Sequence, residues 1–91
     1  MMEMKKNNDF VLRRIADSSV LVPFGSKAIN FNGVITLNDS AEFLWKNISD
    51  VFTIEDIVKL ILDSYDNVTE EVALTNAQRF VDSLKEAGAI E

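Results

Sequence analysis

The hydrophobic pattern of this chain changes its period once, near residue 38, and that change restricts the possible folds more than any other feature. Before it, short runs of branched and aromatic residues alternate with turn residues, a pattern typical of strands. After it, apolar residues recur at helical spacing up to the end of the 91 residues. Strands followed by helices are typical of α+β folds. The sequence therefore predicts a three-stranded antiparallel sheet followed by three helices, an order compatible with a winged helix-turn-helix.

The first two strands are predicted at Phe10–Ile15 and Ser19–Phe24, which should pair as a hairpin across the turn residues between them. A third strand is predicted at Val34–Leu37, directly after an Asn-Gly dipeptide that strongly favours a type I′ turn. A weaker strand signal, at Ala28–Phe31, precedes that dipeptide. Residues 1–9 are polar, so we expect an N-terminal tail with little order, followed by a single domain over residues 10–91.

The first helix is predicted at about residues 39–49, with Asn38 or Asp39 as its N-cap and Glu42 at capping-box spacing. Its apolar face comprises Ala41, Leu44, Trp45 and Ile48. We expect Leu37 to end the preceding strand inside the core and Trp45 to anchor the helix there. The junction between strand and helix is therefore interpreted as structural.

Two further helices are predicted from their start and stop signals. One opens at Thr53 and the other at Thr69, and each threonine precedes two acidic residues that suit the positive end of a helix dipole. The last helix is expected to end at Gly88, because glycine readily adopts the left-handed conformation that follows many helices.

Several kinds of chemistry lack the residues they need. The chain has no cysteine and no histidine, so disulfides, the usual zinc ligands and the usual proton carrier at neutral pH are absent from its sequence. The serines have no histidine to activate them, and helix capping accounts for most of the carboxylates. No glycine-rich phosphate loop or EF-hand spacing occurs. We therefore expect no enzymatic activity, no cofactor and no metal site.

Charge and hydropathy limit the possible partners. Residues 1–37 carry five basic and three acidic groups, whereas residues 38–91 carry four basic and twelve acidic groups. An acidic half repels phosphate backbones, and the last helix, which would be the recognition helix of a winged helix, begins with acidic residues. A winged-helix DNA-binding regulator and a protein-protein docking domain remain the alternatives. No signal peptide or 18-residue apolar run is present, so we expect a cytoplasmic protein without a membrane partner.

A small sheet with an exposed edge can bind an extended peptide as a further strand. The candidate edge is the third strand, with Val34, Ile35, Thr36 and Leu37. The candidate second wall is one flank of the last helix, with Leu74, Gln78, Val81 and Lys85. Leu74 and Val81 are equally compatible with a place in the core. Because an exposed edge can also pair with itself, both a monomer and a homodimer are compatible with the sequence.

The ordered series of motifs along residues 10–90 resembles the PqqD family, also described as precursor-peptide recognition elements. The resemblance is carried by Phe10-Val11-Leu12-Arg13, Val20-Leu21-Val22-Pro23, Leu37 to Trp45, Thr53 to Ile57, Tyr65, Phe80 to Leu84 and Gly88-Ala89-Ile90. It implies a non-catalytic protein that binds the leader of a ribosomally made precursor peptide as an added strand. It further implies that the leader lies against the third strand and the third helix. The partner it implies is a separate modifying enzyme, often a radical S-adenosylmethionine protein.

Overall fold

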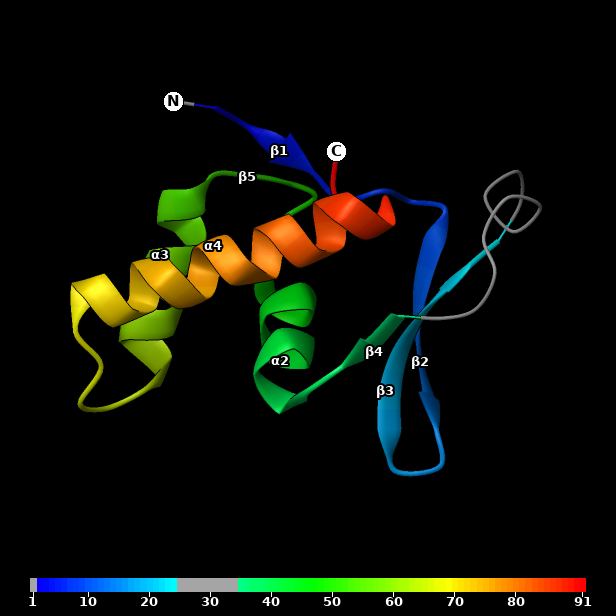
Figure 1. Ribbon diagram of the computed structural model, residues 1–91, viewed down its shortest axis with the longest axis horizontal. Helices are drawn as coiled ribbons and strands as arrows, with labels where there is room; N and C mark the ends of the chain where they lie inside the picture. Colours follow the sequence, from blue (N-terminus) through cyan, green and yellow to red (C-terminus); the bar gives the residue numbers. More distant parts are fainter. Residues whose placement is uncertain (1, 25–34) are drawn as a thin grey trace.

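The computed structural model describes residues 2–24 and 35–91, which form an α+β fold (Figure 1). In chain order the elements are β1 (Met4–Lys5), β2 (Phe10–Ile15), β3 (Ser18–Pro23), β4 (Ile35–Leu37), α2 (Asp39–Asn47), β5 (Val51–Phe52), α3 (Ile54–Ser64) and α4 (Glu70–Ala87). The predicted fold class, a three-stranded antiparallel sheet with three helices, is confirmed within these ranges.

The sheet has the order β2-β3-β4, with both pairs antiparallel. The hairpin prediction is confirmed: β2 has the predicted bounds, and β3 lies one residue earlier than expected. β4 begins at Ile35, whereas Val34, the possible strand at 28–31 and the predicted turn lie outside the described residues. β4 pairs with β3 along one edge only, so its other edge has no partner strand in the described part of the chain.

The helices begin where their capping residues predict. Asn38, rather than Asp39, caps α2, because its side chain accepts the backbone N–H of Ala41 at 2.8 Å. Thr53 forms a full capping box with Asp56 at the start of α3. Thr69 caps α4, which ends at Gly88 with φ 87°.

One capping prediction and one helix end are wrong. Glu42 makes no capping box with Asp39; its carboxylate is instead engaged by the Ser19 hydroxyl of β3. Helix α2 ends at Asn47 rather than near residue 49, because Ile48 adopts an extended conformation and is buried. The energy of burying an isoleucine favours this early turn into the core.

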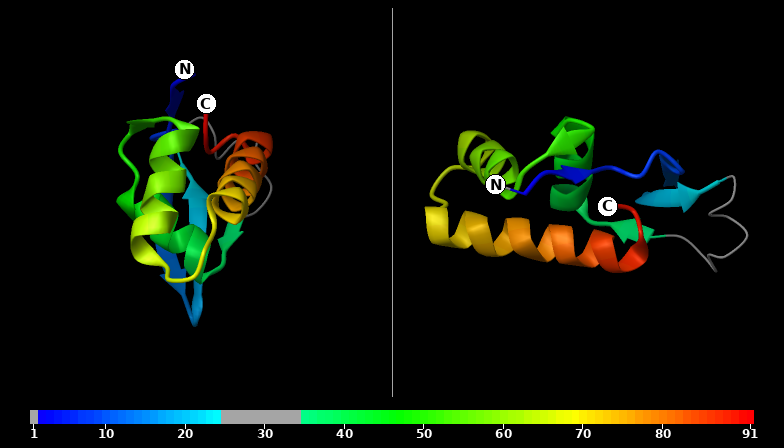
Figure 2. Two further views of the ribbon diagram at one scale, coloured as in Figure 1. Left: turned by 90° about the vertical axis from the view of Figure 1, so that its left-hand side faces the viewer. Right: turned by 90° about the horizontal axis from the view of Figure 1, so that it is seen from above.

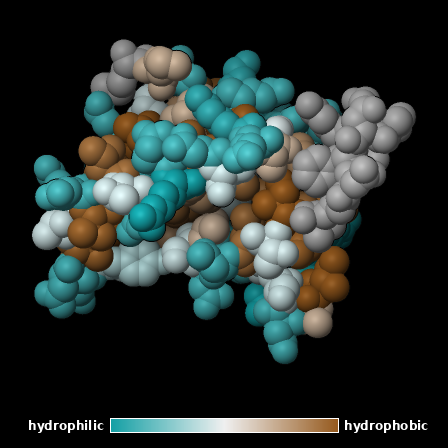
Figure 3. All heavy atoms as spheres, in the orientation of Figure 1, coloured by the Kyte–Doolittle hydropathy of each residue, from teal (hydrophilic) through white to brown (hydrophobic). Residues whose placement is uncertain are grey.

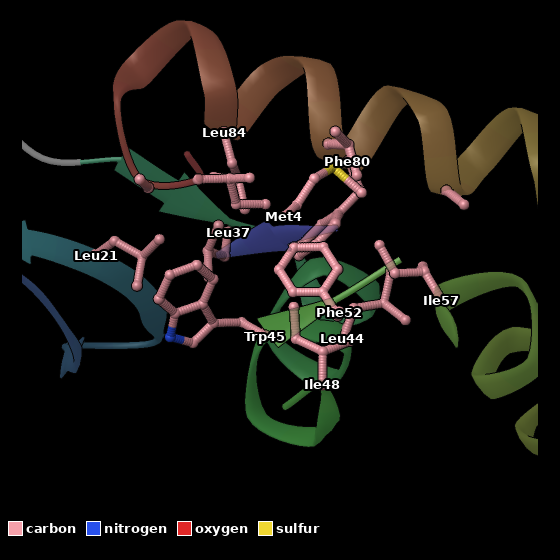
Figure 4. Close-up of a cluster of buried hydrophobic side chains, with 14 of the residues drawn as sticks. Met4, Leu21, Leu37, Leu44, Trp45, Ile48, Phe52, Ile57, Phe80 and Leu84 are labelled. Atoms are coloured by element: carbon pink, nitrogen blue, oxygen red, sulfur yellow. The ribbon is translucent and has the colours of Figure 1, made fainter. Parts of the chain in front are cut away.

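The core joins the sheet to the helices. Figure 4 shows Leu21 of β3, Leu37 of β4 and Trp45 of α2 pointing toward a common interior that the side chains of α4 cover. Leu21 and Ile57 are fully buried, and Trp45 is 7% exposed. The predicted role of Trp45 as an anchor of α2 in the core is therefore confirmed.

The expectation of little order near the N-terminus is wrong for residues 4–7. Strand β1 pairs with β5, and Met4 is buried in the core. Lys5 exchanges two backbone hydrogen bonds with Glu91, at 2.9 and 2.8 Å, and Asn7 donates from its side chain to the carbonyl of Gly88. Polar composition predicted a tail, but backbone pairing with distant segments holds these residues in place.

The helices α2, α3 and α4 form one group, and the β2–β3 hairpin forms a second group beside it. Helix α4 runs along the molecule, with α2 and α3 next to each other on one side of it, and the β2–β3 hairpin lies beyond its C-terminal end (Figure 2). Lys5 of β1 and Glu91 at the C-terminus lie side by side at this end of α4, joined by their backbone hydrogen bonds. Strand β4 connects the two groups, since it pairs with β3 and leads directly into α2.

A pair of methionine variants tests whether the N-terminal strand belongs to the fold. We expect Met4→Ala to lower the free energy of unfolding by about 2 kcal/mol, because it removes a side chain that is only 7% exposed. Met2→Ala is the control, since Met2 is 79% exposed, and should change stability by less than about 0.5 kcal/mol. Urea unfolding followed by the fluorescence of Trp45, the single tryptophan, measures both. Equal stabilities of the two variants would contradict the packing of β1.

Candidate functional site

A cavity of about 500 Å³ lies between the edge of the sheet and the helices. It is bounded by β4, the start of α2, the end of α3 and one flank of α4. Its lining residues are Ile35, Thr36, Leu37, Asn38, Ser40, Ala41, Leu44, Ile61, Tyr65, Val68, Asn76, Arg79, Phe80, Ser83 and Leu84. Figure 3, drawn in the orientation of Figure 1, shows a mixed surface with hydrophobic patches between hydrophilic side chains.

The lining is apolar at its base and polar around its rim. The base consists of side chains that also belong to the core, namely Leu37, Leu44, Ile61, Phe80 and Leu84. The rim consists of exposed polar side chains, namely Thr36, Ser40, Asn76, Arg79 and Ser83. Ligand sites in proteins commonly combine an apolar interior with a few polar groups that fix orientation.

Local structure places the two ends of the cavity. At one end a single residue, Asn38, separates β4 from α2, so the sheet edge and the first turn of the helix adjoin one another. At the other end Tyr65 follows α3 and packs edge-to-face on Phe43 of α2, with ring centroids 5.8 Å apart. This aromatic pair links α2 to the end of α3 on one side of the cavity.

A polar cluster holds α2 against the sheet. The Glu42 carboxylate accepts a hydrogen bond from the Ser19 hydroxyl and lies 3.1 Å from Lys46 Nζ and 3.6 Å from an Arg14 nitrogen. The Ser19 hydrogen bond, and after it the one from Lys46, holds the pKa of Glu42 below its ordinary value. These contacts fix the helix that forms one wall of the cavity to strand β3.

The structure brings part of the predicted site together. Ile35, Thr36 and Leu37 line the cavity, whereas Val34 lies outside the described residues. The four residues predicted on the last helix, Leu74, Gln78, Val81 and Lys85, do not line it. Val81 is 2% exposed and belongs to the core, while the other three are exposed on α4. Their role in binding stays a prediction.

The flank of α4 that faces the cavity carries Asn76, Arg79, Phe80 and Ser83. These residues are spaced three and four apart, so they share one face of the helix. Sequence reasoning passed over the three polar residues, because polar side chains leave no mark in an apolar periodicity. The sequence did contain one indication of these residues, because they lie one to four positions from Phe80 and therefore beside it on the helix.

A small α+β domain with a sheet edge that no other described strand pairs, beside an apolar cavity, has the geometry of a binding module. In a comparison with protein families, residues 18–90 match the family described as "Coenzyme PQQ synthesis protein D (PqqD)". This match covers most of the chain, which therefore belongs to the PqqD family. No curated protein and no solved structure was found to match it.

Family membership supports a role in biosynthesis, since the family is described as a coenzyme PQQ synthesis protein. It also implies an interaction with a biosynthetic enzyme. Across the described residues, none of the helices is both long enough and apolar enough to span a membrane.

The Glu42 cluster predicts how stability depends on pH. Because the folded state lowers the pKa of Glu42, its contribution is present above the ordinary glutamate pKa of about 4.3 and is lost as the pH falls below that value. We expect the unfolding free energy of the wild type to fall more steeply than that of Glu42→Gln between about pH 5 and about pH 3. Urea unfolding at a series of pH values measures this difference.

The matched control for this measurement is Glu86→Gln. Glu86 is exposed on α4 and makes no hydrogen bond or ion pair with another described residue. The pH course of this variant should run parallel to that of the wild type. If Glu42→Gln also ran parallel to the wild type, the Ser19–Glu42 contact would not contribute to stability.

Proposed function

We propose that this protein binds the leader segment of a ribosomally synthesised precursor peptide and presents it to a separate modifying enzyme, without doing chemistry itself. The observation that carries the proposal is the position of β4. Among the described strands β4 is an edge of the sheet, and it is also a wall of the cavity, since Ile35, Thr36 and Leu37 all line the cavity. An extended peptide at this edge would gain backbone hydrogen bonds and side-chain contacts together.

The backbone hydrogen bonds at the strand edge and the side-chain contacts in the cavity contribute unequally to binding. β4 is three residues long, so an added strand makes few backbone hydrogen bonds with it. The cavity volume of about 500 Å³ lies within the range of small-ligand sites and is large enough for side chains of the peptide. We therefore assign the register of the peptide to the strand edge and most of its affinity to the side chains that enter the cavity.

The chemistry of the lining supports binding rather than catalysis. Among the described residues, its ionisable side chains are Tyr65 and Arg79, and neither is paired there with a carboxylate or a histidine that could act as a general base. The two lining serines, Ser40 and Ser83, have no histidine available in the chain to activate them.

The charge of the surface supports a peptide rather than a nucleic acid as the ligand. The net charge is −6, and α4 begins with Glu70 and Glu71, where a recognition helix would meet phosphates.

The first test identifies the ligand and then locates it. Affinity purification of the tagged protein from its source cells should recover a short peptide together with a modifying enzyme. Titration of the ¹⁵N-labelled protein with the synthetic leader should then shift the amide signals of residues 35–37 and of the cavity flank of α4. Shifts confined to other surfaces, or a Kd weaker than about 100 μM, would refute the proposal.

Two variants determine which flank of α4 contacts the peptide. Ser83→Phe places a bulky side chain on the rim of the cavity and should weaken leader binding at least about tenfold. Gln78→Phe makes the same change in size on the flank predicted from the sequence, where the side chain of Gln78 bonds Asp82 instead of lining the cavity. We expect Gln78→Phe to bind nearly as tightly as the wild type.

Both positions are exposed, so the stability of each variant should stay within about 0.5 kcal/mol of the wild type. Isothermal titration calorimetry with the leader gives the two affinities. The opposite order, with Gln78→Phe the weaker binder, would assign the peptide to the flank of Leu74, Gln78 and Lys85.

A further inference from the structure

We propose that Arg79 makes this site selective for an acidic side chain carried by an otherwise apolar segment of the peptide. The inference rests on the proposed function, because it concerns which peptides the same cavity accepts. It is based on three observations: the charge of the lining, the missing partner of Arg79 and the apolar base beneath it.

The charge of the cavity lining is opposite in sign to the net charge of the protein. The chain carries 15 acidic and 9 basic residues, yet among the described residues that line the cavity none is acidic and Arg79 alone is charged. An uncharged wall with a single cation favours a ligand with a negative charge at one position, and it disfavours a lysine or arginine there.

Arg79 is not committed to any other role in the described structure. The ion pairs found there join Arg14 and Lys46 to Glu42, and no hydrogen bond or ion pair to Arg79 is present. The nearest acid on the same helix, Asp82, accepts a hydrogen bond from Gln78 at 2.8 Å. All five N–H donors of the guanidinium are therefore available, in a planar arrangement that fits both oxygens of a carboxylate.

The neighbours of Arg79 extend the polar strip along the rim. Asn76 and Ser83 lie on the same helical face, and neither forms a side-chain hydrogen bond with another described residue. Both can therefore donate to a carboxylate or to the backbone of an extended peptide.

The base of the cavity determines the rest of the ligand. Leu37, Leu44, Ile61, Phe80 and Leu84 form this apolar base below the strip. Side chains of a strand alternate between its two faces, so those that enter the cavity come from every second residue. The peptide that fits carries an aspartate or glutamate and a branched or aromatic residue at positions of the same parity, two or four residues apart.

Selection from a display library of random dodecapeptides tests this inference whether or not the natural leader has been identified. Wild-type protein should enrich peptides with an acidic residue and an apolar residue at such spacing. The Arg79→Gln variant should still enrich apolar residues but should no longer enrich acidic ones. The Arg79→Glu variant should enrich lysine or arginine in place of the acidic residue. Lys59→Gln, which removes one exposed positive charge from α3 outside the cavity, should select the same peptides as the wild type.

Binding of one selected peptide gives the quantitative test. Arg79→Gln and replacement of the peptide's acidic residue by its amide should each weaken binding roughly tenfold, about 1.4 kcal/mol. Both changes together should weaken it little further, because they remove the same contact. Circular dichroism should show the variant folded, since Arg79 is exposed.

The possible results separate this inference from the function on which it rests. Enriched peptides that displace the leader or shift residues 35–37, but show no acidic preference that depends on Arg79, overturn the role of Arg79 and leave peptide binding standing. Failure to enrich any peptide that contacts the cavity overturns both. If the losses of binding free energy from Arg79→Gln and from the change in the peptide were additive, a direct contact between the guanidinium and the carboxylate would also be rejected.

Discussion

The passage of the chain from β4 into α2 through a single residue is the constraint on which the rest of the structure depends. Leu37 is buried at the end of the strand, Asn38 caps the helix, and within the next two turns Leu44 and Trp45 enter the core. The sheet edge therefore cannot shift without moving α2. Ser19 reinforces this link, since its backbone pairs opposite Leu37 and its hydroxyl bonds Glu42 of α2. Edge and cavity wall are in this way parts of one rigid unit.

Local signals explain why much of the fold was predictable. The caps at Thr53 and Thr69 and the left-handed Gly88 are determined by neighbouring residues, so the helix bounds follow from short stretches of sequence. The pairing of Met4–Lys5 with Val51–Phe52 joins segments almost fifty residues apart through two-residue strands. Such strands are too short to show a period, and their partners are defined only once the helices have packed. Composition alone was therefore misleading for the N-terminal residues.

The candidate site was predictable on the strand but not on the helix, for a related reason. Periodicity identifies the apolar face of α4, yet it does not determine which side of that face borders the sheet edge. Leu74 is apolar and lies beside this face in the sequence, but it is 49% exposed. Phe80 and Arg79 instead line the cavity together with β4. The crossing angle of two packed elements depends on many side chains at once and is not encoded in one helix.

The cavity also shows how folding and recognition share residues in a small domain. Its base is made of core side chains such as Leu37 and Leu84, 7% and 2% exposed, so a change there alters the stability of the fold as well as the shape of the site. Selectivity can vary independently only at the rim, where Asn76, Arg79 and Ser83 are exposed. Of the described residues that line the cavity, Arg79 alone is charged, so it is the position at which a substitution changes the charge that a bound side chain contacts. A change of charge at Arg79 would then redirect the site to a different peptide while leaving the scaffold intact.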